Sequence, residues 1–245
     1  MQDVIDRKTQ LYFDNYAPEY SISRFSYVLE FVNSRATCES SLVDIGCGAG
    51  NIIEHFQQGT SLQQLCGIDI APNYVKMTKD RLECETHLGS ILDSEFITSL
   101  SNKFDFAILG AVLHHLVAST RRQSKRNARI AVRNALSLLN PGGYLIVIEP
   151  IFYPRFAMDA LFHLKRTVSR ITSQRITFLN EWNNIGEPVV SYLTNEELFN
   201  MITHPGNCSV VDYEIVDTPV SRIWRLMGIT RRTDTTIIGQ KRSSH

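Results

Sequence analysis

Apolar positions along the chain fall either into short continuous runs or into stretches with helical spacing. Short apolar runs bounded by turn residues predict buried strands, and apolar residues three or four positions apart predict amphipathic helices. The predicted strands are Ser41–Ile45, Gln64–Ile70, Thr86–Leu88, Phe104–Leu109, Tyr144–Ile148, Cys208–Val216 and Thr235–Gly239. The predicted helices include Leu11–Ala17, Ser21–Val32, Gly50–Gln58, Asn73–Glu83, Arg121–Leu139 and Phe156–Ile171.

This alternation of strands and helices predicts an α/β fold with a doubly wound, Rossmann-like and mostly parallel seven-stranded sheet. We expect the last two strands to be antiparallel neighbours. The 245 residues suffice for a single domain, 1–245, with a sizeable core. Residues 1–36 are predicted to form a helical N-terminal cap. Residues 149–207, about sixty residues, separate the fifth and sixth predicted strands, more than a usual connection, which predicts an inserted lid subdomain over residues 151–192.

Charge and cysteine content narrow the function classes. The formal net charge is 0, so no nucleic-acid partner is expected. The five cysteines lack metal-binding spacing, so we predict no metal site and reduced thiols in a cytoplasmic protein. No secretory signal peptide is apparent, and no apolar run approaches the roughly 18 residues of a membrane span.

The most informative motif is a glycine-rich turn that follows the first predicted strand. Asp44 precedes Gly46, Gly48 and Gly50 in the pattern Asp-x-Gly-x-Gly-x-Gly. Glycines allow positive φ and close approach of a ligand to the backbone, at the N-terminus of the next helix. The spacing is one residue shorter than the dinucleotide fingerprint. A carboxylate is also unfavourable beside a pyrophosphate but favourable beside an ammonium group. The turn therefore favours a nucleoside with a cationic, amino-acid-like arm over NAD.

Asp69 ends the second predicted strand, roughly twenty residues after the turn. A nucleotide-binding α/β fold places a carboxylate there to accept hydrogen bonds from ribose hydroxyls. The alternative is an aspartate that caps the helix beginning at Pro72.

Two further motifs follow in order. The first runs from Phe104-Asp105 through four apolar residues and Gly110-Ala111 to Val112-Leu113-His114-His115-Leu116. The second is the turn Asn140-Pro141-Gly142-Gly143 before the fifth strand. With the glycine turn, these motifs span Leu42 to Pro150, and on them the chain resembles class I S-adenosylmethionine-dependent methyltransferases of the small-molecule type. The resemblance implies S-adenosyl-L-methionine as cofactor and S-adenosyl-L-homocysteine as product.

The resemblance also implies a set of cofactor-binding residues. The glycine turn would hold the methionine arm, Asp69 the ribose, and the turn after the third strand the adenine. At that turn the family usually carries an acidic residue, whereas this chain has Ser90, with Asp93 three positions later. The predicted cofactor-binding residues are Asp44, Gly46, Cys47, Gly48, Gly50, Asp69, Ile70, Ser90, Ile91, Leu109, Gly110, Ala111 and, from the N-terminal aromatic segment, Tyr16.

The acceptor chemistry is less constrained by the sequence. His114 and His115 are candidate general bases or structural residues, and Glu149 is a candidate to orient the acceptor or take a proton. The absence of a metal-binding cluster and of an Asn/Asp-Pro-Pro-Tyr/Phe motif favours a small-molecule acceptor, methylated on a hydroxyl oxygen in preference to nitrogen or carbon. A non-catalytic scaffold or sensor that binds S-adenosylmethionine is the alternative, and a nucleotide-dependent oxidoreductase is a second rival. The oligomeric state is left open.

Two basic segments carry their own alternatives. The run Arg121, Arg122, Lys125, Arg126 and Arg129 is predicted to be a solvated helix face, with an anionic acceptor as the alternative. The basic amphipathic helix Phe156–Ile171 is predicted to be a lid or a dimer contact, with a membrane surface as the alternative.

Overall fold

A computed structural model describes residues 25–171, 190–204 and 206–243. Its centre is one seven-stranded sheet with the order β3-β2-β1-β4-β5-β7-β6. The strands are β1 (Ser41–Ile45), β2 (Gln64–Asp69), β3 (Glu85–Leu88), β4 (Phe104–Gly110), β5 (Leu139–Tyr153), β6 (Cys208–Thr218) and β7 (Arg231–Lys241).

The sheet is mostly parallel with one antiparallel end. Strands β1 to β5 pair in parallel, whereas β7 pairs antiparallel with both β5 and β6. The expected mostly parallel sheet and the expected antiparallel pairing of the last two strands are thereby confirmed. The strand order reverses between β1 and β4. In open α/β sheets, ligands bind at the carboxyl ends of the strands beside such a reversal.

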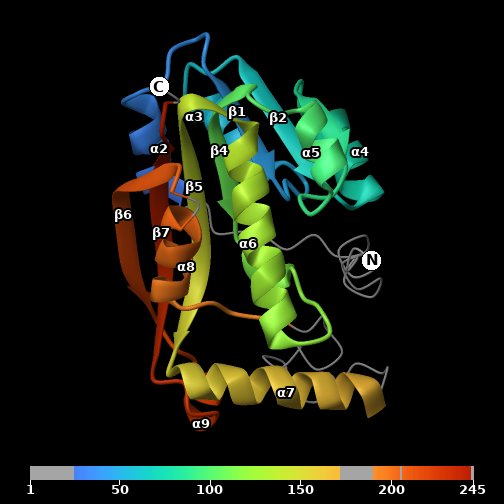
Figure 1. Cartoon of the computed structure of the whole chain (residues 1–245), viewed down its shortest axis with the longest axis vertical. Helices are drawn as coiled ribbons and strands as arrows, with labels where there is room; N and C mark the ends of the chain where they lie inside the picture. The colour runs from blue at the N-terminus through green and yellow to red at the C-terminus, as the bar shows by residue number, and fades with distance from the viewer. Residues whose placement is uncertain (1–24, 172–189, 205, 244–245) are drawn as a thin grey trace.

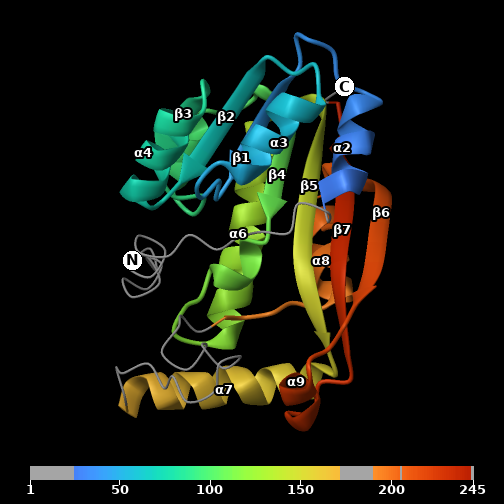
Figure 2. The same ribbon diagram turned by 180° about the vertical axis from the view of Figure 1, so that it is seen from behind.

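Helices cover both faces of this sheet. Figure 1 shows α6 and α8 on one face, and Figure 2, from behind, shows α2 and α3 on the other. The helices are α2 (Ser26–Asn33), α3 (Asn51–Gly59), α4 (Pro72–Arg81), α5 (Ser94–Ser99), α6 (Arg121–Leu138), α7 (Arg155–Ile171), α8 (Asn195–Thr203) and α9 (Arg222–Leu226), with a short 3-10 helix η2 (Leu113–His115).

Each face of the sheet has its own hydrophobic core. One cluster joins α5, α6 and α8 to the sheet through residues such as Ile97, Val132 and Leu198. The other joins α2 and α3 to the opposite face through Val28, Ile53 and Phe56. Central strands covered on both faces should read as continuous apolar runs, and all five residues of β1, Asp44 included, are buried. An aspartate in such a strand needs a chemical reason.

Strand β5 is longer than the apolar pattern predicted at both ends. Leu139 already pairs with Phe104, so the Asn-Pro-Gly-Gly turn lies within the strand, at a bulge in its pairing with β4. Residues 151–153 continue the strand by pairing with β7. The segment outside the sheet therefore begins at Pro154, and α7 then runs crosswise beyond the end of β5 (Figure 1). No helix of the described residues is long and apolar enough to cross a membrane.

Candidate cofactor and active site

The glycine turn between β1 and α3 adopts a conformation that requires its glycines. Gly46, Gly48 and Gly50 have φ of +77°, +52° and +82°, in the left-handed region that other residues rarely adopt. A Cβ on Gly46 would lie 2.6 Å from Val112, and one on Gly50 would lie 2.9 Å from Thr78. At Gly48, no described atom lies within 4 Å of the Cβ position. The turn is thus packed at both ends and open in the middle.

Helix α4 holds this turn from behind. The Thr78 hydroxyl donates to the Gly48 carbonyl at 2.8 Å, and Arg81 Nη1 donates to the Ala49 carbonyl at 2.7 Å. The carbonyl oxygens of the turn are therefore satisfied by protein groups. Thr78 and Arg81 were not among the residues predicted from the sequence, because nothing local links α4 to a turn thirty residues earlier.

Asp44 is the most unusual polar group of the site. It is fully buried, and neither of its carboxylate oxygens has a hydrogen-bond partner among the described residues. Burial, together with the charge of Asp69, raises the pKa of Asp44 to about 8. A buried carboxyl group without partners is costly unless a charged or hydrogen-bonding ligand completes it. Its position beside the open glycine turn suits a cationic group.

Asp69 lies at the carboxyl end of β2 and faces the same turn. Its Oδ2 accepts from the Gly48 backbone N–H at 2.9 Å, and its Oδ1 accepts from the Ala71 N–H at 2.8 Å. The carboxylate therefore fixes the glycine turn and the entry to α4 at once. Each carboxylate oxygen has more than one acceptor position, so these bonds leave capacity for ribose hydroxyls. The helix-capping alternative and the ribose role are compatible at this position.

The turn after β3 lies next to Asp69, since the Gly89 N–H donates to the Asp69 carbonyl at 2.9 Å. Ser90 is half-buried, whereas the Ile91 side chain is buried in the core and leaves only its backbone for a ligand. Asp93 accepts from the Glu95 and Phe96 N–H groups and caps α5. Asp93 therefore serves as the N-cap of α5. We do not assign to it the adenine-binding role that the acidic residue of the family has at this turn.

The end of β4 provides the other side of the reversal point. Leu109 is fully buried, and Ala111 adopts a φ of +59°, which is rare for a residue with a side chain. Its N–H donates to the Ile148 carbonyl at 2.8 Å, so pairing with β5 holds this strained turn in place. Gly110 and Ala111 thus lead the chain into η2 directly opposite the glycine turn, where Val112 meets Gly46.

His114 and Glu149 form a buried pair. Glu149 lies on β5, one residue beyond Ile148, the last residue of β5 that pairs with β4. Its Oε2 lies 2.6 Å from His114 Nδ1. Its Oε1 accepts from the Leu113 N–H at 2.6 Å. Both side chains are almost completely buried. The sequence named both residues but did not predict that they pair. The sequence contained a signal for this pairing, because neighbouring parallel strands bring residues near their carboxyl ends to the same edge of the sheet.

An aromatic cluster borders this pair. Tyr192 stacks on His114 with ring centroids 5.2 Å apart and contacts Phe152 at 4.5 Å. Phe152 in turn contacts Trp224 at 5.2 Å, and the Ser191 N–H donates to the His114 carbonyl at 2.8 Å. These residues come from β5, α9 and the segment before α8. They were missed because single aromatic residues in irregular segments carry no periodic pattern.

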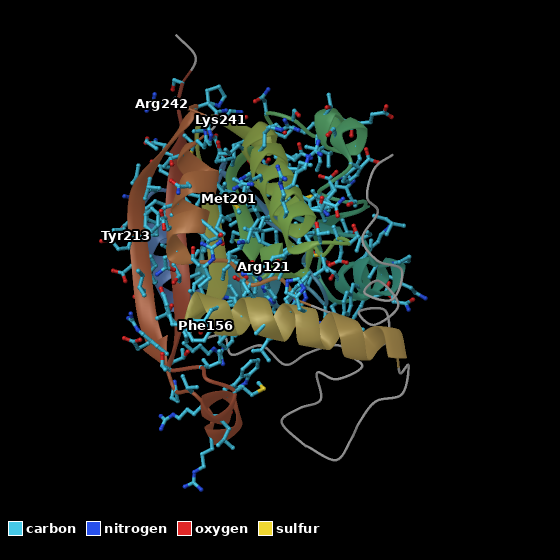
Figure 3. The ribbon with its side chains drawn as sticks, turned by 60° about the horizontal axis from the view of Figure 1, so that its bottom comes forward. Arg121, Phe156, Met201, Tyr213, Lys241 and Arg242 are labelled. Carbon is cyan, nitrogen blue, oxygen red and sulfur yellow. The ribbon has the colours of Figure 1, made fainter. Side chains whose placement is uncertain are left out.

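The basic run of α6 divides into two groups. Arg122, Arg126 and Arg129 are exposed, as the solvated-face prediction expects. Arg121 instead forms an ion pair with Asp159 of α7 and donates to the Tyr192 carbonyl at 2.8 Å, where α6 meets α7 (Figure 3). Lys125 pairs with Glu197 of α8 at 2.6 Å. Two of the five cations therefore tie α6 to its neighbouring helices.

Taken together, the structure gathers Asp44, the glycine turn, Asp69 and the turn after β3 at one end of the sheet, with Gly110, Ala111, His114 and Glu149 across the reversal point. Cys47 contributes only backbone, since its thiol packs against Gly67. The predicted residue Tyr16 lies outside the described residues.

A groove of about 970 Å³, lined by Cys66, Lys79 and Lys103 among others, lies at the opposite, amino end of the strands and does not belong to this site.

Comparison with known proteins agrees with this geometry. Residues 43–147 match the family model described as methyltransferase domain, and this stretch runs from β1 through most of β5. The match contains the three motifs and both sides of the reversal point. The domain is a class I S-adenosylmethionine-dependent methyltransferase domain.

Curated relatives match the chain over part of their length. The chain is 27% identical over 154 residues to a dTDP-3-amino-3,4,6-trideoxy-alpha-D-glucopyranose N,N-dimethyltransferase of Streptomyces venezuelae, covering 60% of each chain. It is 27% identical over 107 residues to nodulation protein S of Rhizobium tropici, covering 44% of this chain and 42% of the relative. The chain thus spans between 42% and 60% of the length of these curated relatives.

Solved structures share the fold over most of the chain. The N-methyltransferase NodS of Bradyrhizobium japonicum, in complex with S-adenosyl-L-homocysteine, has a TM-score of 0.58 and 15% identity, covering 96% of this chain and 99% of that one. A methyltransferase of Methanosarcina mazei has a TM-score of 0.59 and 19% identity, covering 87% and 98%. S-adenosylmethionine is the cofactor of this domain type. The Asp44 carboxyl group, which has no partner among the described residues, suits the ammonium group of this cofactor. The open space at Gly48 allows the cofactor to approach the backbone closely.

Proposed function

We propose that the protein transfers a methyl group from S-adenosylmethionine to a small-molecule acceptor. The observation that supports this most strongly is Asp44, a buried carboxyl group with two unpartnered oxygens beside an open glycine turn. A protein that binds no cationic ligand has no use for such a group, because it destabilises the fold unless a cation completes it.

We propose the following roles for the predicted cofactor-binding residues. Asp44 and the turn Gly46, Cys47, Gly48, Gly50 hold the methionine arm, with Asp44 pairing with its ammonium group. Asp69 accepts hydrogen bonds from the ribose, with Ile70 beside it, and Ser90 with the Ile91 backbone meets the adenine. Leu109, Gly110 and Ala111 would border the methionine side, and the role proposed for Tyr16, from the sequence alone, is to close over it.

S-adenosylmethionine supplies a methyl group on a sulfonium sulfur, which is a good leaving group, so much of the catalysis can be positioning. The chain adds a candidate base in His114. When Nδ1 donates to Glu149, Nε2 is left unprotonated and able to take a proton from an acceptor. Glu149 then stabilises the imidazolium that forms. An acceptor hydroxyl needs such a base, and on this ground we propose O-methylation.

Methylation of an amine is the second candidate. Two similar proteins are named as N-methyltransferases, one acting on an amino sugar nucleotide and one being NodS. An uncharged amine needs no strong base to attack a sulfonium methyl group, so in this case the His114–Glu149 pair would only position the acceptor. The two candidates therefore differ in how far the rate depends on His114.

We further propose that residues 154–192, the part of the predicted segment 151–192 that lies outside β5, form a lid over the acceptor site, and that residues 1–36 form a cap, both within one domain. Helix α7 supports the lid, because it lies beyond the carboxyl end of β5 and is tied to α6 through Arg121. The aromatic cluster around Phe152 and Tyr192 would then form part of the acceptor site next to His114.

The proposal is tested by measuring S-adenosylhomocysteine formation with a panel of small hydroxyl-bearing and amine-bearing acceptors, with mass spectrometry of each product. A methylated oxygen or nitrogen in one product class supports the proposal and selects between its two forms. One structural neighbour is described as a [4+2]-cyclase, which shows that the fold alone does not fix the activity. Binding of S-adenosylhomocysteine without turnover across the panel would favour the scaffold or sensor alternative.

A further inference from the structure

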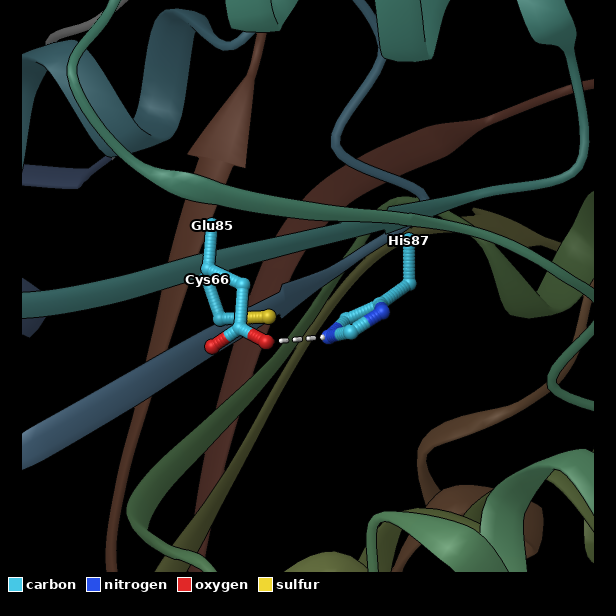
Figure 4. Close-up of side chains that lie close together, drawn as sticks. All are labelled: Cys66, Glu85 and His87. Atoms are coloured by element: carbon cyan, nitrogen blue, oxygen red, sulfur yellow. Dashed lines mark ion pairs between the residues drawn. The ribbon is translucent and has the colours of Figure 1, made fainter.

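Three side chains with metal-binding atoms converge on two neighbouring strands, away from the cofactor site. Cys66 lies on β2, and Glu85 and His87 lie on β3, with Cys66 directly opposite Glu85 in the pairing register. Alternate residues of a strand project to the same face, so Glu85 and His87 share the face of Cys66. Figure 4 shows the three side chains pointing toward one another, and one ligand atom from each lies within 4.8 Å of the others.

The donor atoms of this cluster are poorly used by the protein itself. His87 Nε2 is 2.9 Å from Glu85 Oε1, yet this buried nitrogen makes no hydrogen bond with good geometry among the described residues. The Cys66 thiol has only a long contact of 3.9 Å to the Gly67 carbonyl. Buried polar atoms normally have hydrogen-bond partners. The unpartnered His87 nitrogen and the weakly bonded Cys66 thiol, both beside the Glu85 carboxylate, therefore point to a missing common partner.

We propose that Cys66, Glu85 and His87 bind a Zn²⁺ ion. A thiolate, an imidazole and a carboxylate together match the ligand preference of Zn²⁺, whereas Ca²⁺ and Mg²⁺ prefer oxygen ligands alone. Three protein ligands leave the fourth tetrahedral position to water. Water can reach the site, because Cys66 and Glu85 also line the groove at the amino end of the strands. On binding, the thiol becomes a thiolate and releases its proton to solvent.

The position of the site indicates a structural role. Strand β3 has four residues, lies at the edge of the sheet and pairs only with β2. An ion held by both strands would fasten this edge. Two residues after His87 the chain reaches Gly89, whose N–H donates to the carbonyl of Asp69. Zinc would thus stabilise the strand that leads into the proposed adenine-binding turn, without itself touching the cofactor.

The test is zinc binding to the purified, reduced full-length protein after chelator treatment, measured by competition with a chromophoric chelator. Cobalt substitution adds a direct readout, since a thiolate ligand gives a charge-transfer absorption band. We expect one ion per chain. Cys66→Ser should abolish the charge-transfer band, and Cys66→Ser and His87→Ala should each weaken binding by about 100-fold or more, above the usual loss for an outer-shell partner.

Two controls make the test specific. Cys84→Ser removes a neighbouring thiol that packs against the other hydrophobic cluster, and His204→Ala removes an exposed histidine. Both variants should keep wild-type affinity and the cobalt band. Thermal unfolding confirms that each variant is folded, and the Tm of the wild type should rise as the free zinc concentration is increased above the Kd. Absence of binding by folded wild type, a charge-transfer band that survives Cys66→Ser, or equal loss in Cys84→Ser would overturn the proposal.

Discussion

At the scale of single residues, the site depends on carboxyl groups whose surroundings differ. Asp69 is satisfied by two backbone N–H groups, Glu149 by a histidine and a backbone N–H, and Asp44 by no described residue. Among these three carboxyl groups, Asp44 alone is buried without a hydrogen bond from a described residue that would offset the free-energy cost of its burial. A residue that weakens the fold but faces a ligand site is expected where binding has been favoured over stability.

The first prediction concerns the stability cost of Asp44. Its pKa is raised from 3.8 to about 8, so folding takes up a proton between these pH values and the free energy of unfolding falls as pH rises through that range. Asp44→Asn should therefore stabilise the free protein by a few kcal/mol at pH 8, since each pKa unit corresponds to about 1.4 kcal/mol, and have little effect near pH 4. Urea unfolding at both pH values measures this.

The control for that measurement is Asp80→Asn, which changes an exposed aspartate. It should leave the difference between the two pH values as in the wild type. The same Asp44→Asn variant should bind S-adenosylmethionine more weakly at pH 7, because the ammonium group then lacks its carboxylate. A variant that is both no more stable at pH 8 and unchanged in affinity would refute the role assigned to Asp44.

The second prediction separates His114 from His115. If His114 is the base for a hydroxyl acceptor, His114→Gln should lower kcat by about 10² to 10⁴-fold while S-adenosylhomocysteine affinity stays unchanged. His115→Gln, the matched control, should keep most of kcat. Glu149→Gln should also lower kcat and alter its pH profile, because the imidazolium would lose its partner. Equal and small losses in all three variants would indicate positioning only, as expected for an amine acceptor.

At the scale of elements, the glycine turn and its neighbours were predictable, and the long-range pairings were not. The turn is visible because three glycines with positive φ leave a local sequence signature. The His114–Glu149 pair joins residues thirty-five positions apart and depends on which strands are neighbours. The Cys66–Glu85–His87 cluster depends on strand register, which cysteine spacing along the chain does not reveal. The prediction of no metal site rested on that spacing.

The boundaries of β5 show the same limit. The pattern predicted an end at Ile148 because Glu149-Pro150 follows, and proline lacks a backbone donor. Beyond Ile148, however, β5 no longer pairs with β4 and continues only against β7. A proline is tolerated in a strand with one open side. The proline is visible in the sequence. That β4 no longer pairs with β5 at this point, and so leaves one side of β5 open, is visible only in the structure.

The third prediction tests the open position of the turn. Gly48→Ala places a Cβ where no described atom lies within 4 Å, at a φ of +52°. We expect a stability loss of about 1–2 kcal/mol from the left-handed backbone, and a much larger loss of S-adenosylhomocysteine affinity from steric overlap with the ligand. Gly206→Ala is the matched control, with a φ of +73° and equally open surroundings outside the site. It should lose similar stability and keep affinity; equal affinity in both variants would contradict the turn's role.

The fourth prediction concerns the connection between α6 and α7. Arg121 bonds both Asp159 and the Tyr192 carbonyl, and burial lowers its pKa without removing its charge. Arg121→Ala should therefore increase hydrogen exchange in α7, with a local loss of about 1.5–3 kcal/mol for bonds to a charged group. Arg122→Ala, at an exposed position, is the control. Unchanged exchange in α7 would show that its packing through Met158 and Phe162 is sufficient.

At the scale of the whole molecule, the reversal of strand order explains why the site lies where it does. The chain crosses from β1 to β2 and β3 on one side and to β4 and β5 on the other, so the turns after β1 and β4 separate at their carboxyl ends. All predicted cofactor residues within the described chain lie at or just after the carboxyl ends of β1 to β4. The residues that we propose for the acceptor site lie instead in β5, α9 and the segment before α8, where the sequence motifs of the cofactor site do not extend.

The most direct test of the central claim is calorimetric titration of the purified protein with S-adenosylhomocysteine and with NADH, for the wild type and Asp69→Asn. We predict micromolar binding of S-adenosylhomocysteine at one site per chain, no binding of NADH, and strongly weakened binding in the variant. A well-folded wild type that ignores S-adenosylhomocysteine, or binds NADH in its place, would contradict the assignment of this site.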